Sequence, residues 1–415
     1  MHVYVLATLD TKGPEADFVC RRLNELGVAT KLVDTGCLGE PTVPANVSRD
    51  EVFLAANTSL AANTSLVAMH EQGDRGMAVT KAAEGCANFI SAAYARHEVA
   101  GVLGLGGSAG TTIGTAAMRA LPLGVPKVMV STLASGQTRP YVGDKDIFML
   151  NSVVDIAGIN RISRRVLGEA AAAMAGLVKF RREETDPSDK PLIAASMFGV
   201  TTPCVQHARR ILEDAGYEVL VFHATGNGGL AMESLIREGL IAGVLDITTT
   251  ELADELVGGI LSAGPNRLTA AGEKGIPQVV SVGALDMVNF GPWGTVPEKF
   301  RNRKFHRHNE NVTLMRTTPE ENAKLGEEIA RKLSAAKGPV TILLPRLGVS
   351  AIDREGQPFD DPVARDMLFE AILQNTPCVR VIEFPTNHIN DEGFAEKAAL
   401  ELLSRMGVRF QTKYR

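Results

Sequence analysis

The chain has 415 residues, of which 45% are hydrophobic and 22% are charged. This composition is ordinary for a globular protein, and the length exceeds what one hydrophobic core usually spans, so we expect two domains. The formal net charge of -5 argues against general nucleic-acid binding, which needs an excess of lysine and arginine to neutralise phosphates.

The amino-terminal part of the sequence alternates strand-like and helix-like segments. The first expected elements are a strand at 2–8, a helix at 14–26 and a strand at 29–33. Such alternation is typical of a parallel sheet flanked by helices. Asp10, Thr11 and Lys12 directly follow the first strand, at the position where open α/β sheets usually bind ligands. A capped turn with a solvated lysine is the equally weighted alternative.

A short tandem repeat interrupts this pattern. Ala55–Leu60 and Ala61–Leu66 both read AANTSL, which is too short for a solenoid unit. We interpret the repeat as a local duplication in a tolerant segment and assign it no function. Helical periodicity returns at 75–95 and leads into the next strand.

The segment Val99–Thr115, which reads VAGVLGLGGSAGTTIGT, is the most informative stretch of the chain. It combines an apolar strand, a glycine-rich turn and a helix start, so backbone amides can converge on an anion and hydroxyls can assist. The candidate ligand groups are those of Gly106, Gly107, Ser108, Gly110 and Thr111. We predict a site for phosphate or carboxylate. The P-loop lysine and a strict GxGxxG spacing are absent, so a turn whose glycines serve only close packing is the alternative.

A second polar loop follows the predicted strand at 127–131. Its candidate binding residues are Ser131, Thr132, Ser135 and Gly136. Consecutive strands of a right-handed α/β sheet are usually neighbours, so we expect this loop to face Gly107 across one crevice. Asp144 and Asp146 follow and are candidates for a divalent ion that accompanies phosphates, although a solvated loop is the favoured interpretation for them.

The charged stretch Arg181–Pro191 is interpreted as a linker, which places the domains at 1–185 and 186–415. The second domain repeats the pattern, with a strand from 192 and further strands at 219–223, 243–247, 278–282 and 340–345. The sequence therefore predicts an α/β protein with two Rossmann-like domains, each an open, mostly parallel sheet flanked by helices.

Titratable side chains gather where the strands of the second domain end. They are His223, Asp246, Glu251, Asp286, His306, His308 and His388, of which His223, Asp246, Glu251 and His388 are the catalytic candidates. Histidines and carboxylates at neighbouring strand ends can hold a metal or act as acid and base. No HExxH-like motif is present, so such a site must be assembled through space. A structural role has equal weight, and His306 and His308 lie in a basic run typical of a solvated surface.

The cysteines and the amino terminus indicate a compartment. Five scattered cysteines without CxxC spacing are typical of a reducing environment and give no structural zinc motif. The chain begins with a strand-like segment in place of a basic region and an apolar core, and no apolar run is long enough to cross a bilayer. We therefore expect a cytoplasmic protein.

Several long motifs together resemble one protein family. They read TLDTKG, GLGGSAGT, STLASG, HATGNGG, DITTTELADELVGG, SVGALDMVNFG and NVTLMRTTPEEN. By these motifs nearly the whole chain is similar to the Tm-1-like ATP-binding proteins. The resemblance implies two α/β domains, ATP and Mg²⁺ bound by the first domain, and a homodimer or higher homo-oligomer. The nucleotide contacts that it implies lie at 10–12, 106–111 and 131–136, the loops already selected from their chemistry.

Two classes of function fit these observations. We favour an enzyme that binds ATP and acts on a small anionic substrate at a cleft between the domains, because a binding module has little need for histidines and carboxylates at several strand ends. The alternatives are a nucleotide-responsive protein-binding module, and a metal-assisted hydrolase or lyase of a sugar-acid-like substrate without ATP turnover. We expect neither nucleic acid nor a membrane among the partners.

Overall fold

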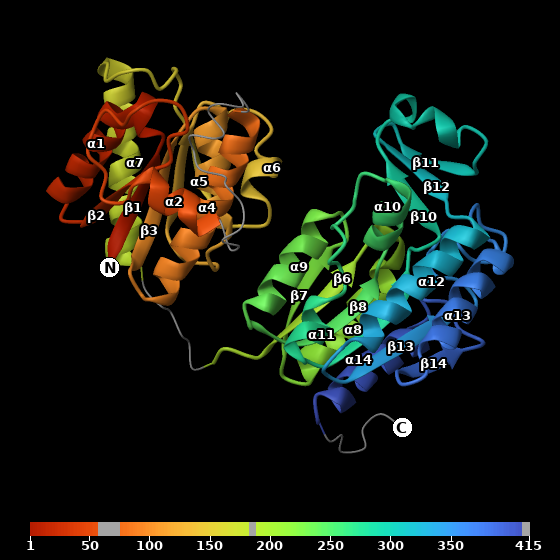
Figure 1. The fold of residues 1–415 in the computed structure, drawn as a ribbon. Helices are drawn as coiled ribbons and strands as arrows, with labels where there is room; N and C mark the ends of the chain where they lie inside the picture. Colours follow the sequence, from red (N-terminus) through yellow and green to blue (C-terminus); the bar gives the residue numbers. More distant parts are fainter. Residues whose placement is uncertain (57–74, 182–187, 409–415) are drawn as a thin grey trace. The chain divides into compact units, whose positions relative to one another are not determined.

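A computed structural model describes residues 1–56, 75–181 and 188–408 of the chain. The chain divides into two compact units, Met1–Thr185 and Asp186–Arg415, and each unit contains its own parallel sheet with helices on both faces (Figure 1). The predicted fold class is therefore confirmed. Apart from Ala55 and Ala56, the AANTSL repeat lies outside the described residues.

The amino-terminal unit is built on a five-stranded parallel sheet in the order β2-β1-β3-β4-β5. Its strands are β1 (His2–Ala7), β2 (Thr30–Asp34), β3 (Val99–Gly106), β4 (Lys127–Ser131) and β5 (Phe148–Asn151). The helices described in this unit are α1 (Leu9–Glu25), α2 (Arg49–Ala56), α4 (Arg75–Ala95), α5 (Ser108–Arg119), α6 (Arg139–Val142) and α7 (Arg161–Phe180).

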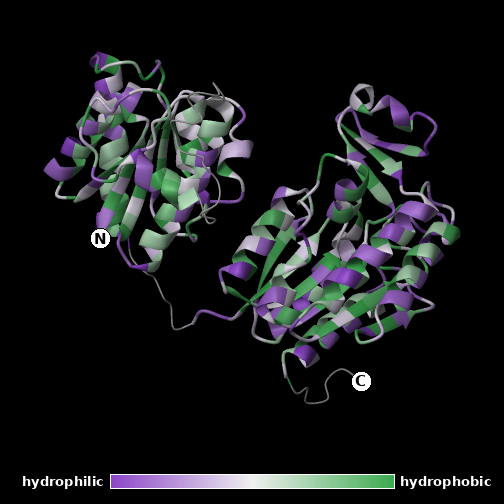
Figure 2. Ribbon diagram, in the orientation of Figure 1, coloured by the Kyte–Doolittle hydropathy of each residue, from purple (hydrophilic) through white to green (hydrophobic). Residues whose placement is uncertain are grey.

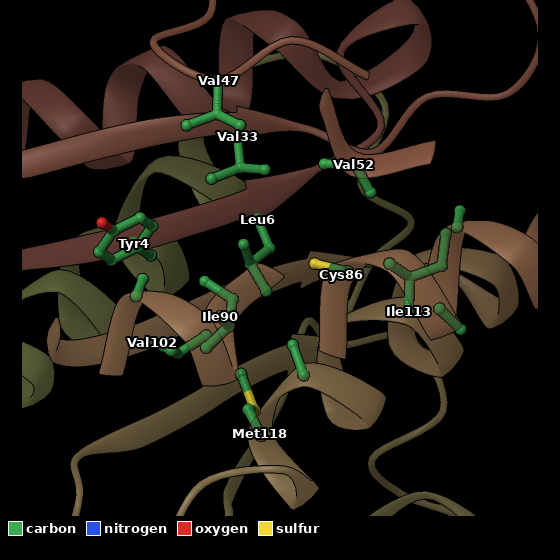
Figure 3. Close-up of a cluster of buried hydrophobic side chains, with 14 of the residues drawn as sticks. Tyr4, Leu6, Val33, Val47, Val52, Cys86, Ile90, Val102, Ile113 and Met118 are labelled. Carbon is green, nitrogen blue, oxygen red and sulfur yellow. The ribbon is translucent and has the colours of Figure 1, made fainter. Parts of the chain in front are cut away.

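Alternation along the strands sends side chains to both faces of this sheet. Tyr4 and Leu6 of β1 join a core with α2, α4 and α5, in which Ile113 is fully buried (Figure 3). Val3 and Val5 pack on the opposite face against α1 and α7. Because both faces are covered, β1 and β3 consist of almost continuous apolar and glycine residues.

The order of the strands leaves an opening at one edge of this sheet. β1 leads through α1 to β2 on one side, whereas β3 leads through α5 to β4 on the other, and α1 and α5 cover different faces. The two connections diverge at the carboxyl ends of β1 and β3, which is the position where open α/β sheets bind ligands. The segments that meet there begin at Thr8 and Gly107.

The carboxyl-terminal unit has a six-stranded parallel sheet in the order β14-β13-β9-β8-β6-β7. Its strands are β6 (Leu192–Met197), β7 (Glu218–His223), β8 (Ile241–Thr248), β9 (Gln278–Gly283), β13 (Val340–Pro345) and β14 (Arg380–Phe384). The α-helices described in this unit are α8 (Thr202–Asp214), α9 (Asn227–Arg237), α10 (Glu251–Val257), α11 (Ala270–Lys274), α12 (Pro319–Ser334), α13 (Pro362–Asn375) and α14 (Glu392–Arg405).

Both faces of the second sheet are also covered. Val279 of β9 packs with α8 and α14, whereas its neighbour Val280 packs on the other face with α10, α12 and α13. The helices α9 and α11 complete that second face beside β6 and β8. Figure 2 shows the result in both units, with hydrophobic colour along the strands and mixed colour along the helices. No helix in the described parts of the chain combines the length and apolar character needed to cross a bilayer.

A small antiparallel sheet extends the carboxyl-terminal unit (Figure 1). Its strands are β10 (Met287–Phe290), β11 (Phe305–Asn309) and β12 (Val312–Arg316), in the order β10-β12-β11. Trp293 follows β10, and its ring lies edge-on to Phe305, with 5.0 Å between the ring centres. The guanidinium of Arg307 lies 4.6 Å from the centre of the Trp293 ring, which places the sole tryptophan of the chain between an aromatic and a cationic neighbour.

Several strands were not predicted from the sequence, β14 among them. β5 was missed because a strand of four residues is too short to show a clear period. The antiparallel sheet was not predicted either, since the edge strand β11 carries charged and histidine side chains in place of an apolar alternation. Basic residues on an edge strand are common because they discourage pairing with other strands.

Candidate functional site

A pocket of about 220 Å³ lies at the carboxyl ends of β1 and β3 in the amino-terminal unit. Two of the three loops predicted to bind a ligand contribute to it, the one after β1 and the one after β3. The lining residues are Thr8, Asp10, Thr11, Lys12, Cys37, Leu38, Val79, Gly107, Ser108, Ala109, Gly110, Ile113 and Asp155. The lining therefore combines apolar side chains with backbone amides, hydroxyls, an ammonium group and carboxylates.

The amino terminus of α5 contributes backbone amides to the lining. Gly107 is the N-cap residue and supplies no capping side chain, and Thr111 is the first residue of α5 whose amide donates to a backbone carbonyl that precedes the helix, that of Gly107, at 2.8 Å. The amides of Ser108, Ala109 and Gly110 precede this bond and have no acceptor among the described residues. Unpaired amides and the positive end of the helix dipole favour a bound anion.

The three glycines of this loop have different roles. A Cβ atom on Gly107 would meet only the Thr132 hydroxyl, at 3.7 Å, so the missing side chain leaves space in the pocket. A Cβ atom on Gly106 would lie 2.9 Å from the Cα of Gly110, and one on Gly110 would lie 3.0 Å from the Leu105 carbonyl. Close packing of helix on strand therefore explains Gly106 and Gly110, whereas Gly107 is open to a ligand.

The loop after β4, unlike the other two predicted loops, contributes no residue to the lining of the pocket. Ser131 and Thr111 are buried, and their hydroxyls bind each other at 2.6 Å, which fastens α5 to β4. Thr132 lies beside Gly107, but Ser135 and Gly136 are exposed and are not among the residues that line the pocket. Nothing in the structure tests whether these four residues touch a nucleotide, so their binding role stays a prediction.

The start of α1 contributes Asp10, Thr11 and Lys12 to the lining. Lys12 has non-helical dihedral angles (φ -129°, ψ 17°), so α1 is kinked two residues before Pro14, and the Lys12 ammonium donates to the Ile156 carbonyl. One carboxylate oxygen of Asp10 accepts from the amides of Leu38, at 2.8 Å, and Gly39, at 3.2 Å. The Thr11 hydroxyl lies 3.0 Å from that of Thr8. Asp10 thus fixes the loop after β2, whereas Lys12 binds the segment that precedes α7.

Asp155 lines the pocket and was missed by the sequence analysis. It is exposed and lies in the loop between β5 and α7, where one of its carboxylate oxygens accepts from the Ile156 amide at 2.8 Å. A prediction of β5 would have revealed Asp155, because it would then follow the carboxyl end of a strand. The alternation of FMLN was the available signal, but four residues carry little weight.

The two aspartates considered as candidates for a divalent ion lie outside the pocket. The Asp146 carboxylate binds the ammonium of Lys127, at 2.7 Å, and the amide of Gly124, at 2.8 Å. Lys127 is fully buried and needs a counter-ion, which explains this placement. Neither Asp144 nor Asp146 lines the pocket. Within residues 1–56, 75–181 and 188–408, no group of three or more His, Cys, Asp and Glu side chains has the arrangement of a metal site.

The corresponding position in the carboxyl-terminal unit is filled by a buried arginine. Arg267, between α10 and α11, is fully buried, and its guanidinium binds Asp246 with two bonds of 2.5 and 2.7 Å. It also binds Glu251 at 2.7 Å and Glu233 at 3.4 Å. The Ser196 hydroxyl donates to Asp246 at 2.5 Å and joins β6 to β8. The switch point of the second sheet is therefore packed with an ion-pair network.

Glu251 occupies the place that an anionic ligand would take in this unit. One of its oxygens accepts from the amides of Gly226, at 2.7 Å, and Gly229, at 3.0 Å, at the start of α9. A Cβ atom on Gly229 would lie 2.2 Å from this carboxylate, so the missing side chain of Gly229 makes room for Glu251. Burial raises the pKa of Glu251, and the charge of Arg267 opposes this shift.

The two histidines among the catalytic candidates lie in contrasting surroundings. His388 is buried, and its ring nitrogens bind the Ser350 carbonyl at 2.8 Å and the Asn390 amide at 3.1 Å. Burial lowers the pKa of His388, which favours the neutral ring that this pair of bonds requires. His223 is exposed at the end of β7, edge-on to Phe198 with 5.4 Å between ring centres. Catalysis by His223, Asp246, Glu251 or His388 stays a prediction, but only His223 is open to solvent.

A sequence motif could hardly have indicated Arg267. It lies in the segment GPNRLTAAG, without another charged residue beside it. The available signal was indirect. Asp246 lies within the otherwise mostly apolar strand β8 and Glu251 follows it, and buried carboxylates require a cation. The sequence analysis assigned these carboxylates to chemistry because their partner is distant in the chain.

Asp286 is a second buried carboxylate with unusual surroundings. One oxygen accepts from the Ser350 hydroxyl at 2.8 Å, and the other has no hydrogen-bond partner among the described residues. Burial and the nearby charge of Asp353 raise the pKa of Asp286 to about 7, although Arg316 opposes this. The side chain is thus neutral over much of the acidic range.

The free energy of unfolding should depend on pH through Asp286. Between about pH 4 and 7 the folded chain holds a proton that the unfolded chain has lost, so this stabilising contribution fades as pH rises through 7. Asp286→Asn is neutral at every pH. We therefore expect this variant to lose the pH-dependent contribution of Asp286 to the free energy of unfolding, which is of the order of a few kcal/mol. Urea unfolding of both proteins at about pH 5 and pH 8 measures it. Parallel changes in the two proteins would contradict the expectation.

Comparison with known proteins assigns both parts of the chain to one protein family. Models of the uncharacterised protein family UPF0261 match both parts of the chain, the N-terminal domain at residues 1–183 and the C-terminal domain at residues 190–406. A UPF0261 protein of Clostridium tetani is 50% identical over 406 residues, which is 97% of this chain and 98% of that protein.

Two tomato proteins are also similar. The ToMV resistance protein Tm-1(GCR237) and the ToMV susceptible protein tm-1(GCR26) of Solanum lycopersicum are each 43% identical over 409 residues, 95% of this chain and 54% of each of those proteins. The chain thus spans about half the length of the tomato proteins, and it is equally similar to the resistance and the susceptible form. The resemblance to Tm-1-like proteins is confirmed, and the chain belongs to UPF0261, an uncharacterised protein family.

Proposed function

We propose that the amino-terminal unit binds the phosphates of ATP, together with Mg²⁺, in the pocket at the carboxyl ends of β1 and β3. The observation that carries this proposal is the uncapped amino terminus of α5, which opens onto a pocket beside Gly107 and Lys12. The amides would bind phosphate oxygens, Lys12 would neutralise part of their charge, and the missing side chain of Gly107 admits the ligand.

The size of the pocket indicates which part of the nucleotide it takes. A volume of about 220 Å³ is below the roughly 300–1,000 Å³ of pockets for drug-sized ligands. The pocket is therefore of a size to hold the phosphate chain with its cation. The lining also includes the apolar side chains of Leu38 and Val79, which suit an uncharged part of the ligand.

The first test is a calorimetric titration of ATP with Mg²⁺ into the wild-type protein and into Lys12→Met. We expect wild type to bind and the variant to bind about 10–100-fold more weakly, because a hydrogen bond to a charged group contributes about 1.5–3 kcal/mol. Lys179→Met, at an exposed position on α7, is the matched control and should bind like wild type. Absence of binding to wild type would exclude the proposed function.

Phosphate release distinguishes an ATP-consuming enzyme from the alternative of a nucleotide-responsive module. In the second unit, Asp246, Glu251 and His388 are buried and bound to protein partners. Their surroundings therefore favour a structural role for these three side chains over a catalytic one. An ATP-consuming enzyme would be supported if the wild-type protein hydrolysed the bound ATP and released phosphate. Stable binding without turnover favours the module.

A further inference from the structure

We propose that Asp155 is the carboxylate that coordinates the divalent cation accompanying the phosphates, and that Glu15 and Lys12 position it. This inference rests on the proposed function, which it deepens. It replaces Asp144 and Asp146, the acids that the sequence suggested, with one that the fold brings to the pocket.

The charges around the pocket call for a cation. Asp10, Lys12 and Asp155 are the charged residues among those that line it, so their formal charges leave one negative charge in excess. A bare polyphosphate would be repelled by both carboxylates, even though the amides of α5 favour it. A divalent cation between phosphate and carboxylate reverses this repulsion, and Mg²⁺ is usually held by one or two carboxylates plus the phosphates themselves.

Asp155 is better suited to this role than Asp10. One Asp10 oxygen already accepts from the amides of Leu38 and Gly39, and the other accepts from the Thr11 hydroxyl at 3.3 Å. Asp155 accepts one hydrogen bond, from the adjacent Ile156 amide, and within the described residues its second oxygen has no partner. That oxygen is available to a cation without breaking a bond of the fold.

The start of α1 holds the Asp155 loop at two points. Glu15 accepts from the Gly158 amide at 2.5 Å, and Lys12 donates to the Ile156 carbonyl. Glu15 is fully buried, and its second carboxylate oxygen has no hydrogen-bond partner among the described residues. Burying a carboxylate with an unbonded oxygen costs free energy of folding. The presence of Glu15 is explained if its bond to Gly158 holds the Asp155 loop in the position that binding requires.

The test compares ATP affinity in EDTA with ATP affinity in excess Mg²⁺, using calorimetry on the full chain. We expect Mg²⁺ to tighten binding to wild type by at least about tenfold. Asp155→Asn should bind ATP in EDTA no more weakly than wild type and should lose the gain from Mg²⁺. Asp144→Asn is the matched control, since it removes an equal charge outside the pocket, and should keep the full gain.

Glu15 is tested through the loop that it positions. Glu15→Gln can still accept from the Gly158 amide and should keep the gain from Mg²⁺, whereas Glu15→Ala should lose most of it while keeping its affinity in EDTA. A full gain in Asp155→Asn, or a loss in Asp144→Asn, would overturn the assignment of Asp155. An unchanged gain in Glu15→Ala would overturn the positioning role. If wild type binds no ATP at all, the proposed function fails and this inference fails with it.

Discussion

Replacing Arg267 with methionine is expected to destabilise the carboxyl-terminal unit by at least about 3–5 kcal/mol, because it leaves buried carboxylates without their counter-ion. Asp246, Glu251 and Glu233 are nearly inaccessible to solvent and all bind the Arg267 guanidinium. Since domains are stable by only about 5–15 kcal/mol, the loss would remove a large part of the total. Urea unfolding followed by far-UV circular dichroism measures it.

Two further variants keep this prediction testable if Arg267→Met does not fold. Arg267→Lys retains the charge but loses the two-bond contact with Asp246, so an intermediate loss is expected. Arg237→Met removes an arginine that also binds Glu233 but is partly exposed, and it should cost less than about 1 kcal/mol. Similar small losses at both arginines would show that the network does not support the fold.

Replacing Gly107 with valine should weaken ATP binding by at least about 100-fold, or roughly 2.7 kcal/mol, without disturbing the fold. The backbone there has negative φ (-82°), and a Cβ atom would meet only the Thr132 hydroxyl at 3.7 Å. The added carbons would therefore extend into the pocket, where phosphates are proposed to approach the amides of α5. Calorimetric titration with ATP and Mg²⁺ gives the affinity, and circular dichroism checks the fold.

The same substitution at two other glycines sharpens this experiment. A Cβ atom on Gly199, in the other unit, would meet no atom within 4 Å, so Gly199→Val is the matched control and should bind normally. Gly136→Val tests whether the loop after β4 contacts the nucleotide. The family resemblance implies a contact at Gly136, whereas Gly136 does not line the pocket. Equal affinity of wild type and Gly107→Val would remove the pocket as the ATP site.

The sequence predicted the parts of the fold that depend on local pattern. The apolar run of β3, the turn at Gly107 and the helix start at Ser108 are consecutive in the chain, so spacing alone revealed them. The rule that ligands bind at the carboxyl ends of parallel strands selected both this loop and Asp10–Lys12. The crevice expected beside Gly107 was assigned to the loop after β4, whereas the structure places Thr8–Lys12 there.

The remaining features depend on contacts between distant residues. Asp246 and Glu251 were selected as catalytic candidates because polar residues after apolar strands are common at active sites, but Arg267 lies beyond α10 and could not be paired with them by pattern. His388 was selected for the same reason and proved to be bound at both ring nitrogens. Whether a carboxylate is paired within the fold or open to a ligand depends on contacts between distant residues, and those contacts are a property of the whole fold.

The position of Trp293 gives this protein an optical probe that reports on one unit alone. It is the only tryptophan in the chain and lies against Phe305 and Arg307, so its emission depends on the small antiparallel sheet of the carboxyl-terminal unit. ATP bound to the amino-terminal unit should raise the melting temperature of that unit by mass action. If the fluorescence transition shifts by the same amount, the two units unfold cooperatively; if it does not move, they are thermodynamically independent.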